Sequence, residues 1–509
     1  MEYKEILDSC SDDVVGLLRE LVSFQSVKAE AADGQPFGEE VHKAYACMLA
    51  KAERDGFETF DADGYGGHIE WAGAKTDERG EIIAAAGETL GILVHLDVVP
   101  AGNDWAYDPW AGEITEGRIY GRGTADNKGA AAAVYYAMKA LKESGYVPAK
   151  NVRLILGLDE ETGWSGLDKY FEQAPFPDFG FAPDADFPVV NGEKGMILCE
   201  IARKFESGRA AGLCLRSISG GNAPNMVPDR CRAILVYEEE QEAKGVKSKK
   251  NKAGKVKTGV KDADMREKSF SLVREAVLRF REKTNARIVC KGVGNALEIA
   301  AQGVSAHGAV PENGLNAISV MMDFLRDLPL ANEDALEFVG FYHKRIGYET
   351  DGKGLGIAMS DKISGSLTVN TGMIDLGREA AILTVNIRYP VSKSEDDVYD
   401  ALRTVLDENG LGVVKLPGSM DPLYYAPDDP FIKLLMEVYR ENTGDERSTP
   451  ITMGGASYAR SMPGAVAFGM RFPGEEETMH KKDEYIRIDS LIKAAHIYAD
   501  TIFRLTRPD

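Results

Sequence analysis

An apolar run that ends in adjacent acids is the feature that most restricts the fold of this chain. Residues 152–158 are predicted to form a buried strand, and Asp159, Glu160 and Glu161 follow it directly. Neighbouring carboxylates at the end of a buried strand are costly to keep as bare charges, so we expect a cation such as a metal ion to compensate at least one of them. The other acid is then available to carry protons.

Other segments predict an α/β fold around this strand. Apolar runs at 89–97 and 179–184 also end in polar residues, and an alanine-rich helix is expected from the loop carrying Asp126 to about Glu143. Strands that alternate with helices imply a mostly parallel mixed sheet flanked by helices. Ligands of such sheets bind beyond the carboxyl ends of the strands. His95 and both glutamates fall at that edge.

The length and texture of the chain predict two domains. At 509 residues the chain exceeds the size at which a single core stops growing. We expect a catalytic domain from residues 1–193 and 420–509, interrupted by an inserted α+β domain at residues 194–419. The insertion contains a lysine-rich stretch at 244–261, which is typical of a solvated loop and is assigned no function.

Composition excludes several classes of partner. The chain has 60 basic and 81 acidic residues and a net charge of -21, which disfavours nucleic acid or an anionic membrane as a partner. The six cysteines lack paired spacing, which argues against a disulfide framework or a thiolate zinc site. No signal peptide or membrane span is evident, so a cytoplasmic protein is expected.

Two imidazoles and three carboxylates are candidate metal ligands at strand ends or in loops: His95, Asp126, Glu161, Asp184 and His480. Nitrogen and oxygen donors without thiolate suit zinc, manganese or cobalt better than calcium. One bridging carboxylate with two further ligands per ion would leave room for a shared water that becomes hydroxide. Glu160 could then act as general base. The spacing alone leaves a dinuclear hydrolase and a mononuclear or purely structural site equally open.

Five motifs resemble, in order and spacing, those of the dinuclear zinc metallopeptidase family that includes aminoacylase, carnosinase and glutamate carboxypeptidase. They lie at residues 94–97, 121–129, 159–163, 183–188 and 305–308. Three segments look most like the bacterial dipeptidase V branch of that family: residues 183–195, 222–228 and 478–480. Together the motifs extend over nearly the whole chain.

The resemblance implies a role for each candidate in the catalytic domain. His95 and Asp184 would bind one ion, Glu161 and His480 the other, and Asp126 would bridge both. Glu160 would be the general base. Asp97 would accept a hydrogen bond from the far nitrogen of His95 and fix its tautomer. The family also has a cis peptide after the bridging acid, here between Asp126 and Asn127.

The resemblance makes the inserted domain a lid that contacts the substrate. His307 would stabilise the oxyanion, with Asn225 nearby. Arg388 would hold the C-terminal carboxylate of the peptide through its bidentate fork. A loop would add backbone donors to the same carboxylate, through Gly454, Gly455 and Ser457.

The expected function is that of a metal-dependent dipeptidase that hydrolyses unblocked dipeptides with a metal-bridging hydroxide. Two divalent ions per chain are expected, zinc first, with manganese or cobalt as alternatives. The expected partner is a small peptide substrate, and a monomer is slightly favoured over a homodimer. An N-acyl-amino-acid or succinyl-diaminopimelate deacylase on the same fold remains an alternative, as does a non-catalytic binding protein.

Overall fold

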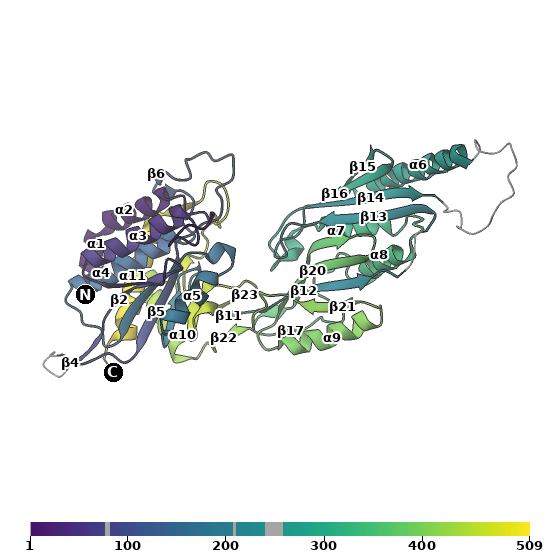
Figure 1. The fold of residues 1–509 in the computed structure, drawn as a ribbon. Coiled ribbons are helices and arrows are strands. Elements are labelled where there is room, and N and C mark those ends of the chain that lie inside the picture. Colours follow the sequence, from purple (N-terminus) through teal and green to yellow (C-terminus); the bar gives the residue numbers. More distant parts are fainter. Residues whose placement is uncertain (1, 77–81, 207–209, 240–257, 509) are drawn as a thin grey trace. The chain divides into compact units, whose positions relative to one another are not determined.

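The computed structural model describes residues 2–76, 82–206, 210–239 and 258–508 (Figure 1). Contacts divide the chain into two compact units. Unit 1 comprises Met1–Asn191, Tyr424–Thr452 and Ala456–Asp509, and unit 2 comprises Gly192–Leu423 and Met453–Gly455. The sequence predicts domain borders after residues 193 and 419. Most of the lysine-rich stretch at 244–261 lies outside the described residues.

Unit 1 is built on a nine-stranded sheet whose centre is parallel. The main path runs β1 (Glu58–Asp61), β2 (Gly67–Trp71), β8 (Asn151–Gly157), β5 (Thr89–His95), β9 (Phe179–Ala182), β24 (Ala465–Ala467), β11 (Val190–Glu193) and β22 (Leu423–Tyr424), and β23 (Ile451–Met453) pairs with β11. The neighbours β8, β5, β9 and β24 are parallel, whereas β2 and β11 join them antiparallel. The predicted mostly parallel mixed sheet is therefore confirmed.

Helices of unit 1 form from the segments with helical periodicity. They are α1 (Glu2–Ser9), α2 (Ser11–Ser23), α3 (Glu39–Arg54), α4 (Lys128–Glu143), α5 (Ser165–Gln173), α10 (Pro430–Thr443) and α11 (Ile488–Thr506). Helix α4 packs against α11, α1 and α2 (Figure 1). Its run Ala130 to Ala133 is almost wholly buried, because small side chains with high helix propensity allow close packing. The alanine-rich segment thus fills the centre of the helical layer.

Smaller elements complete unit 1. They are β3 (Ala74–Thr76), β4 (Ile82–Ala85), β6 (Glu113–Thr115), β7 (Arg118–Tyr120), η1 (Glu160–Thr162), β10 (Ala185–Asp186), η3 (Tyr458–Ser461), β25 (Met470–Arg471) and β26 (Tyr485–Arg487). Two pairings among these elements join distant parts of the chain: β7 pairs with β26, and β10 pairs with β25. These two pairings hold the loops next to the paired strands in place.

Unit 2 is an α+β body with its own core. Its eight-stranded antiparallel sheet runs β15 (Arg287–Val293), β16 (Ala296–Gln302), β14 (Arg230–Glu238), β13 (Gly212–Gly220), β19 (Thr368–Leu376), β20 (Ala380–Tyr389), β12 (Gly195–Lys204) and β21 (Gly412–Lys415). Its other elements are α6 (Thr258–Thr284), η2 (Pro311–Asn313), α7 (Ala317–Leu325), α8 (Glu333–Arg345), β17 (Ser360–Asp361), β18 (Gly365–Ser366) and α9 (Glu395–Asp407).

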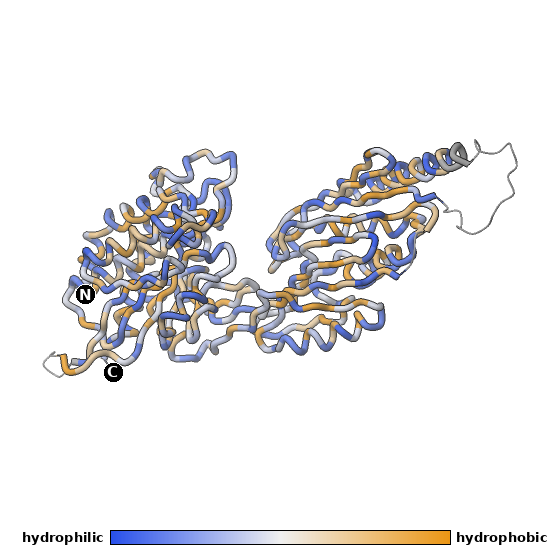
Figure 2. The backbone as a smooth tube through the Cα atoms, viewed as in Figure 1, coloured by the Kyte–Doolittle hydropathy of each residue, from blue (hydrophilic) through white to orange (hydrophobic). Residues whose placement is uncertain are grey.

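Alternating burial explains why these strands form a sheet with one apolar face. Buried and half-buried residues alternate along β12, and Figure 2 shows hydrophilic and hydrophobic segments interleaved in this unit. Side chains of a strand point alternately to the two faces, so one face packs into the core. Each unit therefore has a separate hydrophobic core.

All six cysteines are free thiols, as the lack of paired spacing predicts. Within the described ranges, no helix combines the length and the hydrophobicity that crossing a membrane requires.

Candidate metal centre

The first group of candidate ligands gathers at the carboxyl edge of the sheet in unit 1. His95 ends β5, Asp184 follows β9, and Asp126 lies in the loop before α4. The Nε2 atom of His95 is 2.9 Å from Oδ1 of Asp126 and 3.8 Å from Oδ1 of Asp184. The three residues offer ligand atoms within 4.8 Å of one another. Parallel strands bring these residues together because their carboxyl ends meet at one edge.

A second group shares Asp126 with the first. The Nε2 atom of His480 is 3.0 Å from Oδ2 of Asp126 and 3.1 Å from Oε1 of Glu161. Asp126 therefore turns Oδ1 toward His95 and Oδ2 toward His480. A carboxylate in this orientation can bind one ion through each oxygen, which is the geometry of a bridge.

The charges of the two groups fit divalent cations. Hydrogen bonds to Asp126 and Glu161 raise the pKa of His480 to about 10. Burial raises the pKa of Asp126, but hydrogen bonds from His480 and His95 outweigh burial and hold it below its usual range. Acidic side chains thus surround the two imidazoles. Divalent metal ions can bind there in place of the protons that the imidazoles would otherwise carry. Nitrogen and carboxylate donors without thiolate suit divalent zinc, manganese or cobalt.

Glu160 lies beside these groups in the turn η1. Its Oε1 accepts a hydrogen bond of 3.1 Å from Nε1 of Trp164, a residue with a positive φ of 65°. Burial raises the pKa of the Glu160 carboxyl well above its usual range. A third set of close ligand atoms combines Glu160 with His95 and Glu161. The position of Glu160 therefore permits either proton transfer or direct binding to a metal ion.

Asp97 contacts His95 through both its backbone and its carboxylate. The backbone carbonyl of Asp97 lies 3.0 Å from Nδ1 of His95. The carboxylate is 3.5 Å from the same nitrogen. Its two oxygens also accept hydrogen bonds of 3.1 Å from the backbone amides of Glu160 and Glu161. The carboxylate of Asp97 thus caps the acidic turn and lies beside the imidazole of His95.

Asn127 was not identified from the sequence as a site residue. It is the N-cap of α4, yet its side chain makes no capping bond to that helix. Its Nδ2 donates to the carbonyl of Pro183 at 2.7 Å and to Oδ1 of Asp184 at 3.3 Å, and its Oδ1 accepts from the His95 amide at 3.4 Å. Asn127 thereby links the loop of Asp126 to the segments that carry Asp184 and His95. The peptide between Asp126 and Asn127 is cis, as the resemblance implies.

Two of the expected substrate-binding residues are neighbours in unit 2. An isolated β-bridge pairs Met226 with His307, and the Gly308 amide donates to the Asn225 carbonyl at 2.7 Å. The Ala309 amide donates to Nδ1 of His307 at 3.2 Å. With Nδ1 accepting this bond, Nε2 is the ring nitrogen that can donate.

Arg388 and Gly454 lie near the same loop. Arg388, in β20, is buried and pairs with Thr368 of β19. The hydroxyl of Thr368 donates to the Ala309 carbonyl at 3.4 Å, and a Cβ atom added to Gly454 would lie 3.3 Å from the Cβ of Ala309. Gly455 follows in the same unit, whereas Ser457 belongs to unit 1, where it is buried and precedes η3. The structure therefore splits the expected loop between the units.

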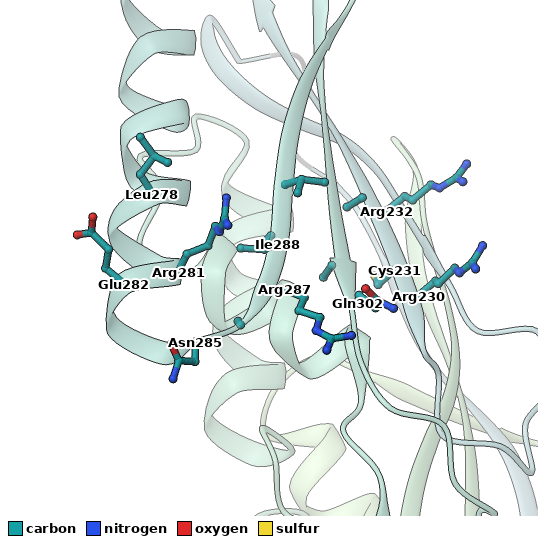
Figure 3. A pocket seen from close by; sticks show the side chains of 14 residues that line it. Arg230, Cys231, Arg232, Leu278, Arg281, Glu282, Asn285, Arg287, Ile288 and Gln302 are labelled. Atoms are coloured by element: carbon teal, nitrogen blue, oxygen red, sulfur yellow. The ribbon is translucent and has the colours of Figure 1, made fainter.

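Each unit also has a cavity. In unit 1, a cavity of about 440 Å³ is lined by Asp184, Ala125 and Thr478 among others, and so opens beside the first ligand group. In unit 2, a pocket of about 820 Å³ is bordered by arginines; Arg230 and Arg232 project from β14 and Arg287 points toward them (Figure 3). None of the candidate ligands lines the arginine pocket. The chemistry of the ligand groups thus belongs to unit 1.

Known sequences are similar to this chain over most of its length. A model of the peptidase family M20/M25/M40 matches residues 91–504. The chain is 34% identical over 500 residues to the Bacillus subtilis (strain 168) protein named "Putative dipeptidase YtjP", covering 97% of this chain and 98% of that protein. It is 33% identical over 512 residues to a "Putative dipeptidase" of Staphylococcus epidermidis, covering 100% of both. Both similarities therefore include the residues of both units.

Solved structures share the fold. A tripeptidase from Staphylococcus aureus superposes with a TM-score of 0.53 at 15% identity, covering 98% of this chain and 99% of that chain. The aminoacylhistidine dipeptidase of Vibrio alginolyticus gives a TM-score of 0.51 at 13% identity, covering 97% of this chain and 96% of that chain. At these identities the likeness concerns the fold alone.

Proposed function

Because the chain belongs to the peptidase family M20/M25/M40, we propose that it is a metal-dependent dipeptidase acting on unblocked dipeptides. The observation that carries the proposal is the pair of ligand groups that share Asp126, with Glu160 beside them. Relatives named as dipeptidases, similar over the full length, support the substrate class.

In this proposal His95, Asp126 and Asp184 hold one ion, and Asp126, Glu161 and His480 hold the other. Bound there, divalent ions would lower the pKa of a water and polarise a peptide carbonyl. The nitrogen that each histidine offers is Nε2, and the Asp97 carbonyl accepts from Nδ1 of His95 and so fixes its tautomer.

Glu160 would act as the general base. The indole of Trp164 holds Oε1 of Glu160 at 3.1 Å, which leaves Oε2 to accept a proton. Burial raises the pKa of Glu160, so the carboxyl can keep that proton until the leaving amine takes it. The indole only donates, so it orients the carboxylate without competing for the proton.

His307 would donate from Nε2 to the oxyanion of the tetrahedral intermediate. The Ala309 amide, which donates to Nδ1, selects the tautomer with a proton on Nε2. A donor oriented before the reaction stabilises developing charge without reorganisation. Asn225 supports the same loop, because its carbonyl accepts from the Gly308 amide.

Arg388 would bind the C-terminal carboxylate of the dipeptide. Its Nε donates to Oδ1 of Asn386 at 2.8 Å, which fixes the plane of the buried guanidinium. A planar fork held in place suits a carboxylate, which it can bind with two parallel hydrogen bonds. Backbone amides of Gly454, Gly455 and Ser457 are assigned to the same carboxylate.

Zinc is the proposed ion, with manganese or cobalt as alternatives that the same donors accept. We further propose a cytoplasmic monomer whose partner is a small peptide, without nucleic acid or membrane. The charge of -21 supports the last two points, because anionic surfaces would repel the chain.

A substrate comparison tests the proposal. Metal-loaded protein is given unblocked dipeptides, tripeptides, N-acetyl amino acids and N-succinyl-diaminopimelate, and kcat/KM is measured for each. Dipeptides are expected to give the highest value. Faster hydrolysis of either blocked substrate would establish the alternative deacylase, and hydrolysis of none by protein with bound metal would favour a non-catalytic binding protein.

A further inference from the structure

The wholly buried carboxylate of Glu484 holds the loop that carries Asp126. Its Oε1 accepts backbone amides from Gly123 at 3.1 Å, Ala125 at 2.9 Å and Asp126 at 3.3 Å. Its backbone carbonyl also accepts from the Gly121 amide at 2.9 Å. A loop whose amides converge on one oxygen has little freedom to shift.

The same residue is linked through the chain to His480. Glu484 lies between His480 and β26, and β26 pairs with β7, the strand before the Asp126 loop. His480 itself has a positive φ of 61° and its side chain is about half exposed. Its side chain contacts Asp126 and Glu161, whereas the position of its backbone depends on the neighbouring segment that Glu484 anchors.

Arg122 compensates the buried charge. Its Nη1 donates to Oε2 of Glu484 at 2.6 Å, both side chains are buried, and the guanidinium lies 5.2 Å from the ring centre of Trp105. Every side-chain hydrogen bond of Glu484 among the described residues is accepted from a donor. The contacts thus suit an ionised carboxylate, which the arginine stabilises within the low-dielectric interior.

We propose that Glu484, paired with Arg122, is a positioning residue that sets the spacing between Asp126 and His480 and so the affinity of the second metal site. This inference rests on the proposed function, because it assumes that Asp126, Glu161 and His480 bind an ion. The first site shares Asp126, but it is held in addition by the bonds of Asn127 to Pro183, Asp184 and the His95 amide. The effect of Glu484 should therefore be selective.

The test is the affinity for Zn²⁺, measured on the full chain by competition with a chromophoric chelator. Glu484→Gln keeps the volume but loses the charge, and we expect it to bind the second ion about 10- to 100-fold more weakly while the first ion is retained. Excess Zn²⁺ should restore hydrolysis of a dipeptide, which a variant that had lost its fold would not allow. Glu476→Gln is the matched control, because Glu476 is exposed in the same segment.

Glu484→Gln alone leaves the charge of Arg122 buried without its acidic partner. A second variant therefore distinguishes a local effect on the metal site from misfolding. Glu484→Gln combined with Arg122→Met removes both charges and should show the same selective loss. Wild-type affinity at both sites, or equal weakening of both ions, would overturn the proposal. These results come from metal binding alone, so they remain distinct from a failure to hydrolyse dipeptides.

Discussion

Orientation, rather than residue type, separates the roles of the acids at this site. Asp126 turns one oxygen toward each histidine, 2.9 Å from His95 and 3.0 Å from His480. Glu160 gives Oε1 to the indole of Trp164 instead. Asp126 and Glu160 both end in a carboxylate group. The neighbouring hydrogen-bond donors therefore determine which acid is suited to bind metal and which to move a proton.

Replacing Glu160 tests this division at the residue scale. Glu160→Gln keeps the hydrogen bond from Trp164 but cannot accept a proton, so we expect kcat for a dipeptide to fall by about 10²–10⁴-fold. Metal content per chain should stay unchanged, as measured by elemental analysis. Glu172→Gln, at an exposed position of α5, is the control and should remain active. A kcat near the wild-type value, or loss of one ion, would contradict the assigned role.

The five candidate ligands could be named from the sequence because each follows an apolar run or lies in a motif of the resembling family. Asn127 and the carboxylate of Asp97 could not be placed in this way. Their contacts depend on where β5 stops and on a side chain that leaves its own helix for a neighbouring loop. Neither property is encoded in residue type or spacing.

At the scale of elements, helix α1 is joined to the C-terminal helices through one buried acid. Asp500 of α11 accepts hydrogen bonds from the hydroxyl of Tyr3 at 2.6 Å, from Nζ of Lys4 at 2.6 Å and from Nδ2 of Asn442 at 2.7 Å. Burial raises the pKa of Asp500, but the bonds from Lys4, Tyr3 and Asn442 outweigh burial and hold it below its usual range. The acid thus stabilises the fold when ionised.

Asp500→Asn should therefore destabilise the protein in a pH-dependent way. A carboxyl with a lowered folded pKa contributes stability above its unfolded pKa of about 3.9, and this is lost as the pH falls through the folded value. We expect the variant to lose about 1–3 kcal/mol of unfolding free energy near neutral pH. Urea titrations at neutral and acidic pH measure the difference, which should shrink in acid. Asp407→Asn, at an exposed position, is the control; a difference that does not depend on pH would refute the account.

The sequence pattern predicted the helices and strands better than it predicted which strands pair with each other. The expected strand at 152–158 and the expected helix ending at about Glu143 match β8 and α4, because the first is a continuous apolar run and the second is rich in alanine, which has high helix propensity. The pairing of β23 with β11 could not be foreseen, since it joins segments about 260 residues apart. Gly454 and Gly455 directly follow β23 in the sequence and fall in unit 2.

At the scale of the whole molecule, the two units have different tasks in the proposed function. All five candidate metal ligands belong to unit 1, whereas Asn225, His307 and Arg388 belong to unit 2. Each unit has its own hydrophobic core. Substitutions of His307 or Arg388 in unit 2 should thus weaken substrate binding or turnover and leave metal affinity unchanged.

The central claim is that hydrolysis depends on ions bound at the Asp126 groups. Protein freed of metal by a chelator is titrated with Zn²⁺ or Mn²⁺, and bound ions per chain are counted while hydrolysis of an unblocked dipeptide is followed. The account predicts no hydrolysis without metal, and activity that returns as binding approaches two ions per chain. Hydrolysis that survives complete metal removal, or binding that saturates below one ion per chain, would contradict it.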